Sequence, residues 1–269
     1  MTWAPLAEAD DETQFGGKAA ALARAVRAGL PVPPGLALAA EFVEAVGSGD
    51  QPAEDELTSL PLPFADGAAV RSSAVGEDSS HASFAGQHKT LLNVEPAGLV
   101  EAVRAVWRSL SWEGALAYRR RLGIQERPRM GVVIQQLVPA EVAGVLFTRN
   151  PINGCAERLI EAGWGLGEVV VDGRVIPDRY RLSPSGAVIE VTSGRKEVVL
   201  RPRPGGGILE QPVKAEGVEQ RCLTERQLEQ LHLLAADCEA VFGHGQDVEW
   251  ALSGPVLHLL QVRPLTTIR

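Results

Sequence analysis

The last stretch of the chain limits the possible folds more than any other segment. Residues 247–252 and 259–264 each alternate apolar with polar side chains, which is typical of a half-buried strand. Ser253, Gly254 and Pro255 follow the first run and favour a turn. The two runs therefore predict an antiparallel hairpin.

The residue numbers predict a register for this hairpin. Facing residues of an antiparallel pair have numbers with a constant sum, so one register pairs Glu249 with Gln261 and also Asp247 with Arg263. All four side chains then lie on one face, because side chains alternate along a strand. That face combines oxygen ligands for a hard cation with a guanidinium suited to phosphate, which predicts a magnesium–polyphosphate site. A surface hairpin with a cross-strand ion pair is the alternative that the hairpin alone leaves open.

Composition narrows the class of protein. The 269 residues carry a net charge of −8, which argues against a general nucleic-acid surface, so an anionic nucleotide would bind where cations gather locally. Cys155, Cys222 and Cys238 form no CxxC pair, which excludes a zinc ribbon and favours reduced thiols. The sequence has no apolar run of about 18 residues, and its first residues do not resemble a signal peptide. We therefore expect a cytoplasmic protein without nucleic-acid or membrane partners.

Hydrophobic periodicity and turn residues predict an α/β (α+β) protein. Helices are expected after Lys18, up to Val46, within 97–121, and from Thr224 to Gly243, where Thr224 and Gln227 resemble a capping box. Residues 47–67 predict a loop. Besides the terminal hairpin, strands are expected at 68–71, 130–137, 142–148, 156–162, 174–182 and 187–192. We expect two lobes, 1–128 and 129–269, with a ligand in the cleft between them.

Two basic residues of the first half are candidates for phosphate binding. Lys18 follows two glycines at the start of a predicted helix, where backbone N–H groups and the helix dipole favour an anion. Arg71 ends an apolar strand and precedes a loop of small residues, so it is expected to point into a cleft. The alternatives are a solvated surface lysine and an ion pair of Arg71 with Glu77 or Asp78.

Two further segments suit a nucleotide. Ser83, Gly86, Gln87 and Thr90 belong to a loop of small and hydroxyl residues that can fold over phosphates, although it lacks the spacing of a P-loop. The strand ending in Gln135 and Gln136 breaks into a linker at Val138 and Pro139, and backbone groups there are suited to read an adenine edge.

Taken together, these segments resemble the nucleotide-binding, ATP-grasp domain of the phosphoenolpyruvate synthase and pyruvate phosphate dikinase family, a group that includes rifampin phosphotransferase. The order and spread of the matching segments cover nearly the whole chain. They are Gly16–Ala19, Ala28–Gly35, Val70–Ala74 with Glu77 and Asp78, Ala82–Gln87, Val132–Gln135, Ala143–Phe147, Trp164–Glu168, Pro177–Tyr180, Asp247–Trp250 and Gln261–Pro264.

The resemblance implies a two-lobed ATP-grasp fold with mixed or antiparallel sheets and the ATP site in the cleft. It implies that Lys18 and Arg71 contact the ATP phosphates from the first lobe and that Arg263 meets them from the second, which makes these three the candidate catalytic residues. Glu249 and Gln261 would hold magnesium, next to Asp247. The remaining nucleotide contacts implied are Gln135, Gln136 and Val138 at the adenine, and Ser83, Gly86, Gln87 and Thr90 in a mobile phosphate lid.

The function that follows is a magnesium-dependent ATP phosphotransferase of the kinase type. The matching segments include no phosphohistidine domain, so the expected acceptor is a histidine on a separate partner domain or a small molecule. Lys89 stands where family members usually carry an acidic residue, which makes the loop more basic. Two alternatives stay open, namely an ATP-grasp ligase that forms an acyl phosphate and a non-catalytic nucleotide-binding subunit.

Overall fold

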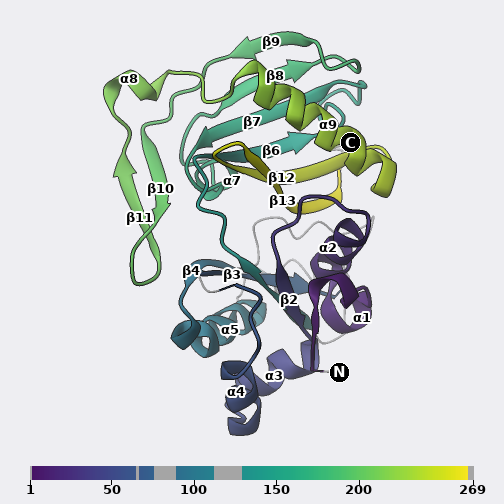
Figure 1. Cartoon of the computed structure of the whole chain (residues 1–269), viewed down its shortest axis with the longest axis vertical. Helices are drawn as coiled ribbons and strands as arrows, with labels where there is room; N and C mark the ends of the chain where they lie inside the picture. Colours follow the sequence, from purple (N-terminus) through teal and green to yellow (C-terminus); the bar gives the residue numbers. More distant parts are fainter. Residues whose placement is uncertain (1, 65–66, 76–88, 112–128, 266–269) are drawn as a thin grey trace. The chain divides into compact units, whose positions relative to one another are not determined.

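Two compact units make up the chain. A computed structural model describes residues 2–64, 67–75, 89–111 and 129–265 (Figure 1). Unit 1 comprises residues 1–27, 33–137 and 203–207, and unit 2 comprises residues 28–32, 138–202 and 208–269. The sequence-based division between 128 and 129 differs from this one, because the strand at 130–136 pairs with strands of unit 1.

A five-stranded sheet forms the centre of unit 1. Its strands are β1 (Trp3–Pro5), β2 (Gly35–Leu38), β3 (Ala68–Ala74), β4 (Thr90–Val94) and β5 (Met130–Gln136). They lie in the order β1-β2-β5-β3-β4, and every neighbouring pair is antiparallel. Every residue of β2 and β3 is buried, so both faces of the sheet are covered.

Short helices surround this sheet. They are α1 (Glu12–Phe15), α2 (Gly17–Arg27), α3 (Ala40–Ser48), α4 (Gln51–Thr58) and α5 (Leu99–Arg108), with 3₁₀ turns at Leu6–Glu8, Pro96–Gly98 and Ser109–Ser111. In α5, Leu99, Val103 and Val106 are buried at helical spacing, as the periodicity predicts for a helix that packs on a core.

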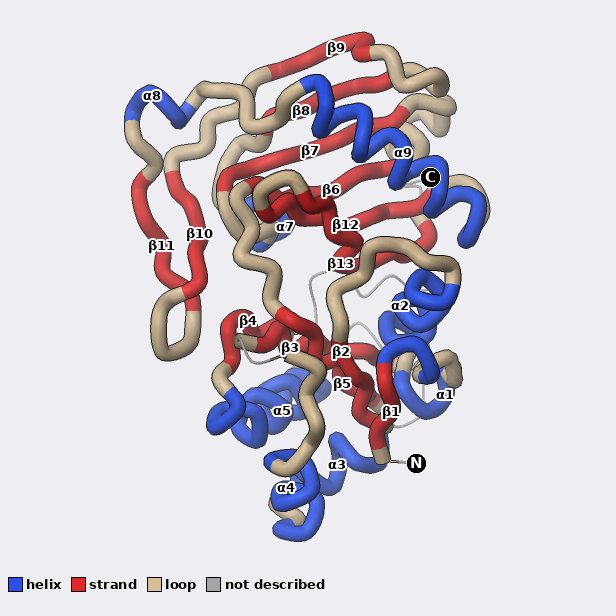
Figure 2. The backbone as a smooth tube through the Cα atoms, viewed as in Figure 1, coloured by secondary structure: helices blue, strands red, loops and turns tan. Residues whose placement is uncertain are grey.

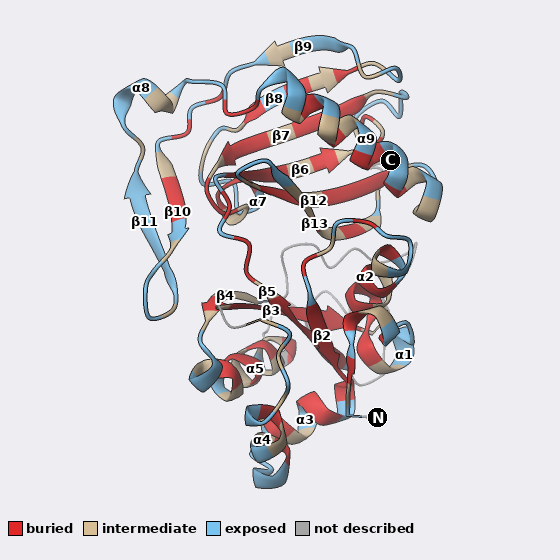
Figure 3. Ribbon diagram, viewed as in Figure 1, coloured by how far each residue is buried: buried red, intermediate tan, exposed pale blue. Residues whose placement is uncertain are grey.

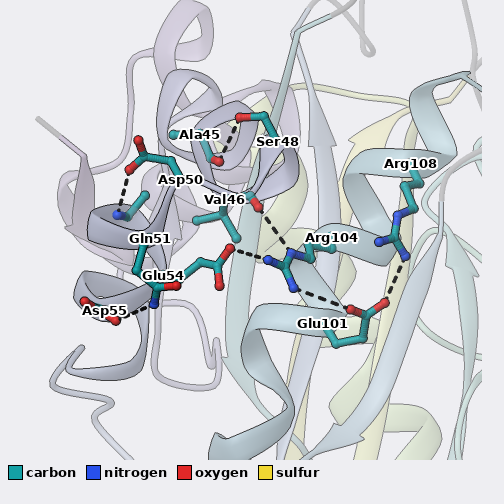
Figure 4. A network of polar contacts seen from close by, with 11 residues as sticks. Ala45, Val46, Ser48, Asp50, Gln51, Glu54, Asp55, Glu101, Arg104 and Arg108 are labelled. Carbon is teal, nitrogen blue, oxygen red and sulfur yellow. Dashed lines mark hydrogen bonds and ion pairs between the residues drawn. The ribbon is translucent and has the colours of Figure 1, made fainter.

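The loop predicted for 47–67 is wrong in its first half, because α4 forms there. The Asp50 side chain accepts a hydrogen bond from the Ala53 backbone N–H at 3.0 Å and caps the helix. Arg104 of α5 pairs with Glu54 and donates to the Val46 carbonyl at 3.4 Å, which ties α5 to α3 and α4 (Figure 4). Asp50 followed by Pro52 is a helix-start signal that the loop-like composition concealed.

Unit 2 contains a six-stranded antiparallel sheet. Its strands are β6 (Val142–Phe147), β7 (Arg158–Trp164), β8 (Asp178–Leu182), β9 (Val188–Thr192), β12 (Gln246–Ser253) and β13 (Val256–Pro264). They lie in the order β13-β12-β6-β7-β8-β9. Burial is concentrated in β12, β6 and β7, whereas β9 at the edge is largely exposed (Figure 3).

A separate hairpin precedes the last helix. Strands β10 (Val198–Pro202) and β11 (Ile208–Pro212) pair with each other, and Gly205, Gly206 and Gly207 in the connecting turn all have positive φ. The sequence predicts the turn but not the strands, because neither run alternates apolar with polar residues. Two short helices, α7 (Glu168–Val171) and α8 (Ala215–Val218), complete this half of the chain.

The predicted capping box of the last helix is confirmed. Helix α9 (Glu225–Phe242) begins with reciprocal hydrogen bonds between Thr224 and Gln227, and it ends at Gly243 with φ of 87°. Its buried side chains include Leu228, Leu231, Ala235 and Cys238, and α9 contacts β6, β12 and β13 (Figure 2). Across the described residues, no helix has both the length and the apolar character that a bilayer crossing requires.

An ion pair between Asp178 and Lys196 lies fully buried in unit 2. Both side chains have zero exposure, and Lys196 Nζ lies 2.5 Å from Asp178 Oδ1. The backbone N–H groups of Gly194 and Cys222 also donate to this carboxylate, at 2.7 and 2.8 Å. Burial raises the pKa of Asp178, but the hydrogen bonds from Lys196, Gly194 and Cys222 outweigh it and leave that pKa below its usual value.

Candidate functional site

The N-terminus of α2 packs directly against β3. Gly16 has φ of 83°, and a Cβ at this position would lie 1.9 Å from the Ser73 carbonyl oxygen, so the position requires glycine. The Ala19 backbone N–H donates to Ser73 Oγ at 3.0 Å, which satisfies one donor of the first helical turn. The close packing at Gly16 therefore fixes the position of Lys18 in the first turn of α2.

Lys18 and Arg71 are brought together in unit 1. Lys18 Nζ donates to the Ser72 carbonyl at 2.7 Å, and Ser72 follows Arg71 on β3. Lys18 is 8% exposed and Arg71 is 7% exposed, so Lys18 is not a solvated surface lysine. Burying two cations in one region is favourable only where anionic groups offset their charge. This region of unit 1 therefore suits a polyanion.

Part of the predicted phosphate loop lies next to these cations. Thr90 faces Arg71 in the register of β3 and β4, which puts its hydroxyl-bearing side chain beside the guanidinium-bearing strand. Ser83, Gly86 and Gln87 fall outside the described residues, as do Glu77 and Asp78, the alternative partners of Arg71.

The three residues predicted to contact adenine differ in their burial and in their hydrogen-bond partners. Gln135 is 1% exposed, and its Nε2 donates to the Pro33 carbonyl at 3.2 Å, so the side chain is used inside unit 1. Gln136 is partly exposed, and its backbone N–H donates to the Pro34 carbonyl at 2.9 Å. The Val138 carbonyl accepts from Ala140 at 2.8 Å in unit 2. An adenine contact at these positions therefore stays a prediction.

The predicted register of the terminal hairpin is confirmed. Glu249 faces Gln261 and Asp247 faces Arg263 in β12 and β13. The register shifts between Glu249 and Trp250, so Trp250 faces Leu259. This irregularity lies beyond the four candidate residues and leaves their pairing intact.

These four side chains lie on the sheet face opposite to α9. Arg158 of β7 points toward α9, since its Nη2 lies 2.5 Å from Glu239 Oε2. Its neighbour Leu159 therefore points to the other face, where it faces Phe147, which in turn faces Asp247. The four candidate residues therefore lie together on the face of the sheet that points away from α9.

Asp247 and Arg263 form a close ion pair across the hairpin. Arg263 Nε and Nη2 donate to Asp247 Oδ2 at 2.9 and 2.7 Å. Asp247 is 9% exposed, and burial raises its pKa with a further contribution from Glu249, while Arg263 acts in the opposite direction. The cross-strand ion pair that the sequence left open is therefore present, and it is nearly buried.

Glu249 and Gln261 have the chemistry of a magnesium site. Both are partly exposed and directly paired, and carboxylate and amide oxygens are ligands that Mg²⁺ accepts. Within the described ranges, no group of three or more His, Cys, Asp or Glu side chains is arranged to hold a metal. Two protein ligands fit magnesium nonetheless, because substrate phosphates and water commonly complete its coordination.

Sequence reasoning missed a buried polar network behind the start of β12. Thr148 and Gln246 exchange two hydrogen bonds of 2.9 Å, and the Thr148 carbonyl accepts from Arg158, which pairs with Glu239. Burial alone would raise the pKa of Glu239, but the hydrogen bonds from Arg158 and His244 outweigh this effect. The pKa therefore lies below its ordinary value, and the carboxylate stays charged. In the sequence, this network is indicated only by Glu239, a charged residue that follows the buried Ala235 by one helical turn on the same face of the helix.

The amino-acid sequence matches a known protein family. The family model described as "Pyruvate phosphate dikinase, AMP/ATP-binding domain" matches residues 52–269. The match confirms the resemblance to the pyruvate phosphate dikinase family that the motifs indicate. The helices and antiparallel sheets of the two units agree with the expected α/β (α+β) class. The segment that contains Gly16 and Lys18 precedes the matched range.

Curated relatives are phosphotransferases and synthases. The chain is 42% identical over 203 residues to rifampicin phosphotransferase of Streptomyces sviceus, covering 74% of this chain and 23% of that protein. It is 41% identical over 204 residues to a probable phosphoenolpyruvate synthase of Archaeoglobus fulgidus, covering 75% of this chain and 27% of that protein. The chain thus spans about a quarter of the length of these relatives.

Solved structures show a distant similarity. The D-alanine–D-alanine ligase of Helicobacter pylori aligns with 90% of this chain and 52% of that chain, with a TM-score of 0.41 and 10% identity. The corresponding ligase of Bacillus anthracis aligns with 94% of this chain and 56% of that chain, with a TM-score of 0.39 and 10% identity.

Proposed function

The chain belongs to the pyruvate phosphate dikinase, AMP/ATP-binding domain family, and from this premise we propose that it binds ATP with magnesium and transfers a phosphoryl group from it. The names of the two curated relatives, a phosphotransferase and a probable phosphoenolpyruvate synthase, support this class of reaction. The acceptor is a histidine on a partner protein or a small molecule.

Lys18 and Arg71 are the proposed phosphate ligands of unit 1. Phosphoryl transfer needs little covalent chemistry from the protein and depends on positioning and on neutralising phosphate charge. The two buried cations and the Thr90 hydroxyl beside them supply charge and a hydrogen-bond donor of that kind. Their burial also limits competition from water for the same contacts.

Glu249 and Gln261 are the proposed magnesium ligands, and Arg263 is the proposed phosphate ligand of unit 2. Magnesium, when bound, would offset the negative charge that develops on the phosphate during transfer. The observation that carries the proposal is the register of β12 and β13, because it puts a carboxylate–amide pair and a guanidinium side by side on one face. Arg263 matches phosphate better than a lysine would, since its planar fork can donate two parallel hydrogen bonds.

Phosphorus NMR of ATP incubated with the protein, magnesium and cell extract tests this proposal. We expect ATP to be consumed only with magnesium, and Glu249→Gln to lose roughly 100-fold or more of the turnover. Glu190→Gln is the matched control, because Glu190 is a carboxylate on β9 at the far edge of the same sheet. Unchanged turnover in Glu249→Gln would rule out the metal assignment.

The same experiment separates the alternatives. Release of ADP only in the presence of an added amine would identify a ligase. Magnesium-dependent ATP binding by calorimetry, without consumption of ATP in any extract, would identify a non-catalytic nucleotide-binding subunit. A new N–P or O–P resonance would distinguish a histidine acceptor from a hydroxyl acceptor.

A further inference from the structure

We propose that Asp247 is a positioning residue that holds the guanidinium of Arg263 in the orientation needed for phosphate, and that it does not itself bind nucleotide or metal. This inference rests on the proposed function of the hairpin. It assigns to Asp247 a task different from that of its neighbour Glu249, although both carboxylates lie on the same face of β12.

Asp247 fixes the direction in which the guanidinium of Arg263 points. The two hydrogen bonds that Arg263 donates to Asp247 both go to one oxygen, Oδ2, and they use the Nε and Nη2 atoms of the guanidinium. Two hydrogen bonds from adjacent nitrogens fix the plane of the guanidinium relative to β12. A bidentate arginine–phosphate contact depends on this kind of fixed orientation.

Arg263 lies on an edge strand of the sheet. β13 is the first strand in the sheet order, so its other side has no neighbouring strand among the described residues. A long side chain on an edge strand loses considerable rotamer freedom when it is fixed for binding. The contact with Asp247 fixes it in advance, so less of that freedom remains to be lost when a phosphate binds.

Asp247 is more deeply buried than its partner Arg263. The side chain of Asp247 is 11% exposed and that of Arg263 is 29% exposed, so the carboxylate lies deeper than the guanidinium. In the register of the sheet, Asp247 stands between Arg263 on one side and Phe147 on the other. A carboxylate enclosed between an aromatic ring and an arginine is poorly placed for a hydrated cation, whereas the partly exposed Glu249 is better placed.

The size of the effect expected from removing Asp247 can be taken from known sites in which one residue orients another that binds the ligand. Removing a residue that orients a ligand typically costs about 10–100-fold in affinity or activity. We therefore expect Asp247→Asn, which keeps the shape but removes the charge, to weaken MgATP binding and turnover by about this factor. Glu190→Gln breaks the pair with Arg181 at the opposite edge of the same sheet and serves as the control, with no loss expected.

A double-mutant cycle separates positioning from direct binding. If Asp247 acts through Arg263, Asp247→Asn should add little to the loss already caused by Arg263→Lys, because the group that it orients is gone. Losses that multiply in Asp247→Asn/Arg263→Lys would overturn the inference. So would wild-type affinity and turnover in Asp247→Asn.

NMR of the arginine Nε–H groups gives a readout that does not depend on activity. In the wild type we expect the Arg263 Nε–H to exchange slowly with water, both alone and with MgATP bound, and to exchange quickly in Asp247→Asn. Fast exchange in the wild type, or loss of protection when MgATP binds, would refute a positioning role even if Asp247→Asn fails to fold. If the wild type neither binds nor consumes ATP, the proposed function fails, while slow exchange that depends on Asp247 still upholds the held guanidinium.

Discussion

Replacing Lys196 by methionine should destabilise unit 2 strongly, because it leaves the Asp178 carboxylate buried without its counter-charge. Methionine has a similar length to lysine and can occupy the same space without the ammonium group. In the variant, Asp178 keeps the backbone donors of Gly194 and Cys222 but loses Lys196 Nζ. Those donors satisfy the oxygens as hydrogen-bond acceptors, but they do not neutralise the charge.

The magnitude follows from the complete burial of both partners. Removing one member of a buried ion pair typically costs about 3–5 kcal/mol, and each kcal/mol lowers the melting temperature of a chain of this size by about 2–4 °C. We therefore expect the melting temperature of unit 2 to fall by about 6–20 °C. Arg195→Gln is a control from the neighbouring position, because Arg195 and Glu197 form a pair that is 59% and 61% exposed. Its loss should be much smaller, because an exposed ion pair is screened by water and contributes little to stability.

The pH dependence gives the sign of the effect. In the wild type the pKa of Asp178 lies below its ordinary value of 3.8, so its contribution to stability is complete above that pH and is lost as pH falls through the folded pKa. In Lys196→Met we expect burial to raise that pKa above 3.8 instead. The folded variant then favours the protonated acid, so the difference in stability between wild type and variant should shrink as pH falls toward 4.

Urea unfolding combined with hydrogen–deuterium exchange of residues 178–182 would measure this loss within unit 2. The variant Asp178→Asn/Lys196→Met removes the buried charge altogether and should recover more than half of the lost stability. A loss in Lys196→Met no larger than in Arg195→Gln, or one that grows toward acid pH, would refute the reasoning.

Two further predictions concern a glycine and a histidine. Gly16 and Gly29 both have positive φ, but a Cβ at Gly16 would meet the Ser73 carbonyl, whereas one at Gly29 would meet nothing within 4 Å. In urea titrations, Gly16→Ala should therefore lower the unfolding free energy by more than Gly29→Ala does. Gly16→Ala should also weaken ATP binding measured by calorimetry. Burial lowers the pKa of His258 from 6.5, so the unfolded chain binds the proton more readily and stability should fall as pH drops through 6.5. His258→Gln should flatten that part of the stability profile, and an unchanged profile would exclude this cause.

Local pattern predicted the parts of the fold that local geometry determines. The register of β12 and β13 followed from alternation and from a short connection, and the capping box of α9 followed from Thr224 and Gln227. The shift between Glu249 and Trp250 was not predicted, because no glycine or other marker in the sequence distinguishes that position. Helix α4 was missed because composition was given more weight than the Asp50 cap.

The candidate site could be predicted as residue types but not as contacts. Lys18 and Arg71 were each selected from their own segments, whereas their proximity depends on α2 packing against β3, 54 residues away along the chain. The pairs Asp178–Lys196 and Arg158–Glu239 were not predicted at all, because charged residues are normally taken as solvated. Their burial depends on long-range packing that a single sequence does not display.

The two candidate sets differ in charge, and the charge of each set indicates the kind of group that it can bind. In unit 1, Lys18 donates to a neutral carbonyl, so this hydrogen bond leaves its positive charge in place, and Arg71 adds a second buried cation. In unit 2, the carboxylates of Asp247 and Glu249 outnumber the guanidinium of Arg263, so that set is negative by one charge and suits a divalent cation. Occupied by magnesium, this second set would become positive and would then favour phosphate oxygens. The cross-strand ion pair is therefore part of the proposed ligand site and not an alternative to it, because without Asp247 the guanidinium of Arg263 would be less well oriented toward phosphate.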